Sequence, residues 1–290
     1  MSISIVGVVG AGFMGSGIAE SIAASGKRVI VYEPSEGPLE RSRGRLAASL
    51  ERAVERGKLA AGDAAALTDR IAYTTRFDDL ADAHAAIEAV SENPQLKGEI
   101  FARMDETLAG AVFLASNTSS IPIADLAAHV RRPERVLGLH FFSPVPVMKL
   151  VEVVVALDTG AATVEAAEAF ADELGKHAIR SKDRAGFVVN LLLVPYLMAA
   201  VRMFDEGFAS AADIDRAMEL GCAHPMGPLT LCDFIGLDVI CDVADSLHAE
   251  FQRPEYAAAP LLRRMVAAGR LGRKSGRGFY DHAPKGGDAS

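Results

Sequence analysis

Short apolar runs rich in valine and isoleucine recur through the first half of the chain. Runs of this length, bounded by polar or glycine-containing segments, are typical of strands buried on both faces of a parallel sheet. The strands expected are residues 3–9, 29–32, 71–74, 86–90, 112–115, 136–142 and 149–155. Helical spacing between them, as in residues 14–25 ahead of Gly26, predicts an α/β fold with a doubly wound sheet.

The segment 38–70 is longer than a simple crossover between parallel strands. Leu46, Leu50 and Val54 recur every fourth residue, which is typical of one face of a helix. Glycines interrupt the pattern near residues 57–62 and indicate a turn. We therefore expect a helical hairpin inserted after the second strand.

After Gly186 the apolar positions follow helical spacing only. Ser210 and Asp213 form a capping-box pattern at the start of one of these segments, where a helix would begin. The helices expected are residues 187–205, 211–220, 228–251 and 260–268.

This change of pattern divides the chain into two expected domains. Residues 1–186 would form the sheet domain and residues 187–290 an all-helical domain. The helical domain would close with a glycine-rich tail over 276–280, anchored by its aromatic rings, and with disordered residues 284–290. Its apolar helices are longer than a small domain needs, so we expect a homodimer formed through these C-terminal helices.

The composition is that of a globular protein with a sizeable core. Half of the 290 residues are hydrophobic, 23% are charged, and the formal net charge is −8. This acidic balance argues against a general nucleic-acid or anionic-membrane partner, but not against an anionic small substrate. The apolar run over 188–201 is interrupted by Asn190 and Pro195 and is too short to span a bilayer.

The sequence has three cysteines, and their spacing matches no known pairing motif. Cys222, Cys232 and Cys241 contain no CxxC motif, which indicates neither a disulfide framework nor a zinc site, so no bound metal is expected. A first strand starting at Ile3 leaves no room for a signal peptide. A reducing cytoplasm is therefore the expected setting.

A glycine-rich segment, GAGFMG, joins the first predicted strand to the helix that follows it. Gly10 permits a tight turn, Gly12 lets the backbone approach a pyrophosphate, and Gly15 allows close packing of helix on strand. The helix start at Phe13 and Met14 offers unpaired N–H groups and a positive dipole end to the phosphates. The sequence therefore predicts a Rossmann-type dinucleotide site.

Glu33 ends the second predicted strand, 18 residues past Gly15, the last glycine of the motif. A carboxylate there would accept hydrogen bonds from the adenosine ribose and repel a 2′-phosphate, which favours NAD over NADP. The alternative is an ordinary solvated glutamate, and the nearby Arg41 and Arg43 leave NADP open.

Three polar side chains in the middle of the chain suggest acid–base chemistry. Ser119 follows one predicted strand, His140 ends another, and Glu152 lies on the strand that returns after a proline-rich turn. The turn would bring Glu152 beside His140. Oxidation of a secondary alcohol releases a proton, for which histidine is the natural base near neutral pH. A carboxylate behind the ring fixes its tautomer and stabilises the imidazolium.

Each of these residues has an alternative role. His140 could be a structural histidine, Glu152 an exposed residue of an edge strand, and Ser119 the N-cap of a helix near Pro122. Asn190, the lone polar residue in an apolar helix, could instead bond a backbone carbonyl freed by a kinking proline.

Seven segments, in order and with compatible spacing, resemble the signature series of the L-3-hydroxyacyl-CoA dehydrogenases. They are GAGFMGSGIA from Gly10, ENPQLK from Glu92, SNTSS from Ser116, HFFSPVPVMKLVEVV from His140, GFVVNLLLVPYL from Gly186, HPMGPLTLCDFIGLD from His224 and GRKSGRGFY from Gly272. The resemblance covers nearly the whole chain and is to the bacterial single-function branch, the 3-hydroxybutyryl-CoA dehydrogenases. It implies reversible NAD-dependent oxidation of (S)-3-hydroxyacyl-CoA to 3-oxoacyl-CoA on short chains.

The same resemblance implies roles for individual residues. His140 would be the catalytic base, Glu152 its partner, and Ser119 and Asn190 the groups that hydrogen-bond the substrate's C3 oxygen between the domains. The residues expected near the nicotinamide ribose are Glu92, Lys97 and Asn117, unless they belong to a solvated loop and helix start.

Two expectations remain. They concern the carrier of the acyl group and Ser143, which follows the predicted strand of His140. The helical hairpin, with Ser42 and the basic residues near Lys58, would receive CoA, although those basic residues could instead form a solvated helix face. Ser143, counted among the cofactor contacts, stands where the family usually has asparagine, so it bears on substrate preference. An acyl-carrier-protein-bound or free 3-hydroxy acid is the alternative substrate. A non-catalytic binding protein is the alternative class, disfavoured because His140 and Glu152 are both present.

Overall fold

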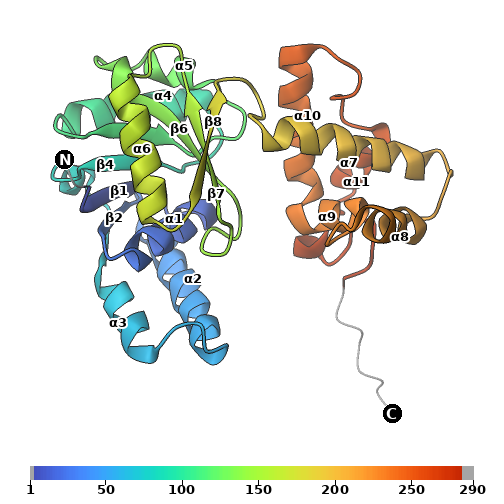
Figure 1. Ribbon diagram of the computed structural model, residues 1–290, viewed down its shortest axis with the longest axis horizontal. Coiled ribbons are helices and arrows are strands. Elements are labelled where there is room, and N and C mark those ends of the chain that lie inside the picture. The colour runs from blue at the N-terminus through green and yellow to red at the C-terminus, as the bar shows by residue number, and fades with distance from the viewer. Residues whose placement is uncertain (1–2, 283–290) are drawn as a thin grey trace. The chain divides into compact units, whose positions relative to one another are not determined.

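The computed structural model describes residues 3–282, and its contacts divide into two compact units, Met1–Arg184 and Ala185–Ser290 (Figure 1). We refer to them as the first and second units. The disorder expected for residues 284–290 falls outside the described residues.

The first unit is built on one eight-stranded sheet of order β3-β2-β1-β4-β5-β6-β7-β8. Its strands are β1 (Ile5–Val9), β2 (Arg28–Tyr32), β3 (Ile71–Thr74), β4 (Ala85–Glu88), β5 (Phe113–Ser116), β6 (Val136–Phe141), β7 (Leu150–Val155) and β8 (His177–Lys182). Neighbouring strands are parallel except β6 and β7, which are antiparallel. The doubly wound α/β fold predicted from the apolar runs is confirmed.

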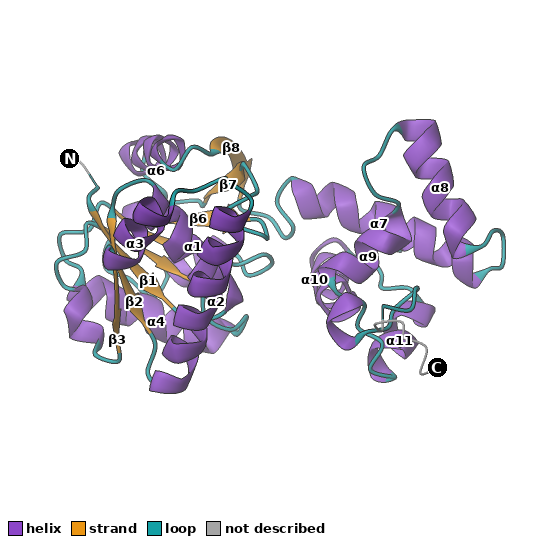
Figure 2. Ribbon diagram, turned by 90° about the horizontal axis from the view of Figure 1, so that it is seen from below, coloured by secondary structure: helices purple, strands orange, loops and turns teal. Residues whose placement is uncertain are grey.

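Helices cover the sheet on both faces (Figure 2). They are α1 (Phe13–Ala24), α2 (Glu36–Glu55), α3 (Ala61–Asp69), α4 (Pro94–Thr107), α5 (Ile123–Ala127) and α6 (Ala161–Glu173), with short 3₁₀ turns at Phe77–Leu80 and Pro133–Arg135. Helices α1 and α6 bury apolar side chains such as Ile18 and Phe170 in one continuous core with the strands. Gly26 follows α1 with a positive φ of 87°, as expected of a residue just past a helix C-terminus.

The inserted helical hairpin is present as α2 and α3. Leu39, Leu46 and Leu50 are the buried face of α2, which packs beside α1. The chain turns after α2 at Gly57, where φ is 64°, and α3 returns to β3. The hairpin extends beyond the body of the first unit (Figure 1).

The second unit is all helical within the described residues. Its helices are α7 (Val189–Asp205), α8 (Ala211–Cys222), α9 (Pro228–Ile235), α10 (Leu237–Phe251) and α11 (Pro260–Ala267), followed by a 3₁₀ turn at Arg273–Ser275. The Ser210 hydroxyl accepts from the Asp213 N–H at 3.2 Å, so the predicted cap is confirmed. The single helix predicted over 228–251 is wrong, because Gly236 has φ 109° and ends α9. No helix among residues 3–282 is long and apolar enough to cross a membrane.

A buried carboxylate anchors the glycine-rich tail to the second unit. Asp233 is 1% exposed and accepts hydrogen bonds from the Phe279 N–H at 2.8 Å and the Tyr280 N–H at 2.9 Å. His282 Nε2 lies 2.8 Å from the same carboxylate. The Phe279 ring packs edge-on against Phe204, so the expected aromatic anchoring is confirmed.

We expect Asp233→Ala to destabilise the protein by about 3 kcal/mol or more, because two buried N–H groups lose their acceptor. Unfolding in urea, followed by circular dichroism, measures this. Asp242→Ala, which removes an exposed aspartate of α10, is the control and should change stability by no more than about 0.5 kcal/mol. Equal effects of the two substitutions would contradict the anchoring role of Asp233.

Candidate functional site

Steric constraints account for the glycines between β1 and α1. Gly10 has φ 110°, and a Cβ there would lie 2.6 Å from the Ala89 carbonyl oxygen. A Cβ at Gly15 would lie 1.9 Å from the Gly10 oxygen, whereas one at Gly12 would meet nothing within 4 Å. Glycine is therefore required at 10 and 15 by the protein's own packing, while Gly12 keeps open the side where a ligand would approach.

A hollow of about 330 Å³ opens beside this loop. It is lined by Gly10, Gly12, Tyr32, Glu33, Pro34, Ala89, Val90, Ser91, Leu96 and Ile100. At the start of α1, Phe13 is 64% exposed and Met14 is half-buried. Glycine backbone and a helix N-terminus together with a carboxylate are groups suited to the phosphates and the ribose of a nucleotide.

The Glu33 carboxylate is held in place by the loop itself. Its Oε2 accepts from the Ala11 N–H at 2.9 Å, and its Oε1 accepts no hydrogen bond among the described residues. Arg43, one of the residues that left NADP open, forms an ion pair with Glu40 and lies over the Tyr73 ring. The carboxylate, rather than that guanidinium, thus lines the hollow.

His140 lies between a carboxylate and a hydroxyl. Antiparallel pairing of β6 with β7 places it directly opposite Glu152, and its Nδ1 is 2.7 Å from Glu152 Oε2. Its Nε2 is 3.1 Å from Ser119 Oγ. The His140 residue is 5% exposed and Glu152 is fully buried. An ionised carboxylate only accepts, so in the neutral ring Nδ1 would carry the proton and Nε2 would be the acceptor that faces Ser119.

These contacts decide two of the alternatives. Glu152 is not an exposed edge residue, because β7 lies between two other strands. Ser119 does not cap a helix near Pro122, because α5 begins at Ile123 and its first N–H groups bond the Asp183 carboxylate at 2.8 Å.

The loop that carries Ser119 is tied to both neighbouring elements. Asn117 Oδ1 accepts from the Phe141 N–H at 2.9 Å, which joins the end of β5 to the end of β6. Glu92 Oε1 accepts from the Ser119 N–H at 3.0 Å and from the Ser120 hydroxyl at 3.1 Å. Burial raises the pKa of Glu92, but its charged and hydrogen-bonded neighbours outweigh burial and hold that pKa below its ordinary value. Glu92 is therefore an anion that fixes this loop.

Lys97 links Glu92 to a second carboxylate beneath the loop. Its Nζ lies 2.7 and 2.9 Å from the two oxygens of Glu88 and 3.2 Å from Glu92 Oε2. Lys97 is 1% exposed, so its alternative reading as part of a solvated helix start is wrong. Sequence reasoning missed Glu88, although a glutamate closing the apolar run of β4 was a signal for a buried, paired charge.

The remaining predicted residues lie in different surroundings. Ser143 is exposed in the loop after β6, and Lys58 is exposed just after α2. Asn190 is partly exposed in the first turn of α7, in the second unit. Ser42 has no exposed surface and its hydroxyl lies 2.8 Å from that of Ser16, so it offers CoA no contact and that expectation needs correction.

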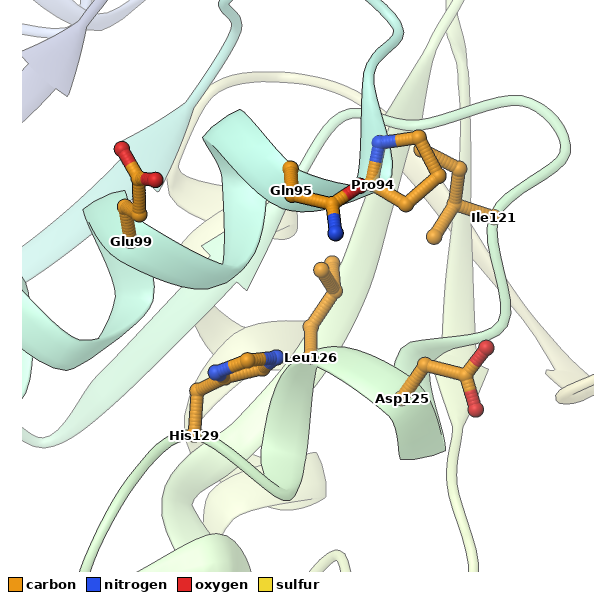
Figure 3. Close-up of a pocket in the computed structure, with 7 residues that line it drawn as sticks. All are labelled: Pro94, Gln95, Glu99, Ile121, Asp125, Leu126 and His129. Atoms are coloured by element: carbon orange, nitrogen blue, oxygen red, sulfur yellow. The ribbon is translucent and has the colours of Figure 1, made fainter.

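A separate hollow of about 300 Å³ lies between α4 and α5 (Figure 3). It is lined by Pro94, Gln95, Glu99, Ile121, Asp125, Leu126 and His129, none of which belongs to the predicted site. The His129 ring packs against Gly98, where a Cβ would lie 2.6 Å from Nε2.

Within residues 3–282, no group of three or more His, Cys, Asp or Glu is placed to hold a metal ion.

Comparisons with known proteins agree with this arrangement. Residues 5–184 match the model of the 3-hydroxyacyl-CoA dehydrogenase NAD binding domain, and residues 186–282 match the model of that family's C-terminal domain. The chain is 51% identical over 283 residues to a 3-hydroxybutyryl-CoA dehydrogenase of Mycobacterium tuberculosis, covering 97% of this chain and 99% of that protein.

Solved structures give the same result. The crystal structure of M. tuberculosis FadB2 superposes with a TM-score of 0.96 at 51% identity, covering 98% of this chain and 100% of that one. The (S)-3-hydroxybutyryl-CoA dehydrogenase of Ralstonia eutropha superposes with a TM-score of 0.92 at 45% identity, with the same coverage. With both domain models matched in order, the chain belongs to the 3-hydroxyacyl-CoA dehydrogenase family, and its first unit is the family's NAD-binding domain.

Proposed function

We propose that this protein catalyses the reversible NAD-dependent oxidation of (S)-3-hydroxyacyl-CoA to 3-oxoacyl-CoA, with 3-hydroxybutyryl-CoA as its substrate. The observation that carries the proposal is His140, held by Glu152 on one side and facing Ser119 on the other. The names of the similar proteins from M. tuberculosis and R. eutropha support the same reaction.

In the oxidation, His140 Nε2 would accept the proton from the substrate's C3 hydroxyl. In the neutral ring, a hydrogen bond from Nδ1 to Glu152 would leave Nε2 as the acceptor that this step needs. The buried carboxylate stabilises the imidazolium that forms, and in the reverse direction that imidazolium returns the proton. Ser119 Oγ, 3.1 Å from Nε2, would hold the C3 oxygen within reach of the base. We assign the second contact to that oxygen to Asn190.

The residues around the glycine-rich loop would hold the cofactor. Bound NAD⁺ supplies the hydride acceptor that oxidation of a secondary alcohol needs. The N–H groups from Gly12 to Met14 would bind its pyrophosphate, and Glu33 Oε1 its adenosine ribose. The residues proposed near the nicotinamide ribose are Glu92, Asn117 and Ser143. Lys97 would act indirectly, since its ammonium group is enclosed by two carboxylates.

CoA would bind along the inserted hairpin. Arg56 and Lys58, exposed just after α2, and Arg52 in its last turn provide positive charge for its phosphates. We propose a cytoplasmic setting, which the three free cysteines support.

We further propose that the protein is a homodimer joined through the second unit. Several large apolar side chains on and beside its helices are exposed in a single chain, among them Leu192 at 72%, Leu220 at 72% and Phe208 at 78%. Light scattering should give twice the 30.6 kDa of one chain, and Leu192→Glu should shift the mass toward one chain. A monomeric wild-type protein would refute this proposal.

The decisive assay for function follows NADH absorbance with acetoacetyl-CoA. We expect rapid loss of NADH with the CoA ester, much slower loss with free acetoacetate, and slower loss with NADPH because Glu33 repels a 2′-phosphate. Activity only with an acyl-carrier-protein thioester would show that the substrate's carrier is that protein and not CoA. No turnover with any of these substrates would overturn the proposed reaction.

His140→Ala should lower kcat by about 10²- to 10⁴-fold, the usual contribution of a general base. Glu152→Gln should also cost more than about tenfold, because an amide N–H facing Nδ1 favours the wrong tautomer. His177→Ala, at an exposed histidine of β8, is the matched control and should leave kcat unchanged. Steady-state kinetics at saturating NADH and acetoacetyl-CoA decide this, and full turnover in His140→Ala would remove the ring from the base role.

A further inference from the structure

An arginine from the inserted hairpin contacts the backbone of the dinucleotide loop. Arg45, on α2, donates through Nη2 to the Ala11 carbonyl oxygen and through Nε to Ser16 Oγ at 3.0 Å. The Ser16 hydroxyl in turn donates to the Gly12 carbonyl oxygen at 2.7 Å. One guanidinium therefore holds the Ala11 carbonyl directly. It also holds Ser16, whose hydroxyl bonds the Gly12 carbonyl.

The contact with Ala11 determines where the next N–H group points. The Ala11 carbonyl and the Gly12 N–H belong to the same peptide plane, and in a trans peptide they point in opposite directions. Since the carbonyl faces Arg45, the Gly12 N–H faces away from α2. A Cβ on Gly12 would meet no atom within 4 Å, so there is open space beside this residue in the hollow.

The positive charge on Arg45 also polarises this peptide. A hydrogen bond from a guanidinium to a carbonyl oxygen makes the N–H of the same amide a stronger donor, because successive hydrogen bonds reinforce one another. On the other side of Ala11, the N–H is held by Glu33 at 2.9 Å. The loop is thus held between Glu33 and Arg45. The Glu33 carboxylate would bind the ribose, and the Arg45 guanidinium lies on the side of the loop away from the proposed pyrophosphate site.

We propose that Arg45 is a positioning residue for the cofactor, which orients and polarises the Gly12 N–H toward the pyrophosphate of the dinucleotide. This inference rests on the proposed NAD-dependent function. It sets Arg45 apart from the basic residues of the hairpin that are available to CoA, since its Nε and Nη2 donate to Ser16 and to the loop. It also predicts an effect on dinucleotide affinity rather than on the chemical step.

The test is fluorescence titration of NADH, without any CoA ester, into the full-length protein and its variants. Arg45→Met keeps the apolar stem and removes the donors, and we expect the Kd for NADH to rise about tenfold or more, equivalent to about 1.4 kcal/mol. Steady-state assays of the same variant should show a matching rise in KM for NADH, with kcat at saturating NADH within about twofold of the wild type.

Arg70→Met is a matched control. Arg70 is partly exposed like Arg45 and also donates to a backbone carbonyl, but to that of Ala23 at the C-terminal end of α1, at 3.3 Å. Its Kd for NADH should stay within twofold of the wild type. Should Arg45→Met fail to fold, Arg45→Lys decides the question, because a single ammonium group cannot replace the two-donor fork and should raise Kd about threefold or more.

The outcomes separate this inference from the proposed function. If the wild type binds no NADH, the proposed function itself fails. If the wild type binds and Arg45→Met binds within twofold of it, the positioning role is refuted while the function stands. Equal weakening by Arg45→Met and Arg70→Met would also refute it, since the effect would then come from general loosening of α1.

Discussion

Glu152 is a fully buried carboxylate on β7, a strand that lies inside the sheet between β6 and β8. An ionised group in that position is costly unless it is paired. Antiparallel pairing places His140 directly opposite, and its Nδ1 supplies the partner. The requirement that keeps the sheet stable is therefore the same one that leaves Nε2 as the acceptor facing Ser119. The hydrogen bond that satisfies the buried charge thus also fixes the orientation of the His140 ring.

A second buried charge network performs a similar task for the loop opposite the histidine. Lys97 lies between Glu88, at the end of β4, and Glu92, which holds the backbone and side chains around Ser119. Asn117 joins the same loop to the end of β6. The loop that carries Ser119 is thus fixed from two sides.

Much of the fold and part of the site could be predicted from the sequence, for physical reasons that also explain the failures. The strands of the parallel part are apolar on both faces, so their runs stand out, and the glycines at 10 and 15 have no alternative residue. Strand β8 was missed because it carries exposed polar residues at the edge of the sheet. The break at Gly236 was missed because the apolar spacing continues across it. The burial of Ser42 and the inward turn of Arg45 depend on how α2 packs against α1, which spacing along one helix does not reveal.

The anchoring of the tail in the second unit has a consequence for biosynthesis. Asp233 lies in α9, yet its three partners come from residues 279, 280 and 282, close to the end of the chain. Until these residues leave the ribosome, the carboxylate has to remain hydrated or stay buried without them, and the helices around it are correspondingly less stable. A chain that ends before residue 279 would keep nearly all of its apolar core and lose this anchor. The stability of α9 thus depends on a segment that is synthesised 46 to 49 residues after Asp233 itself.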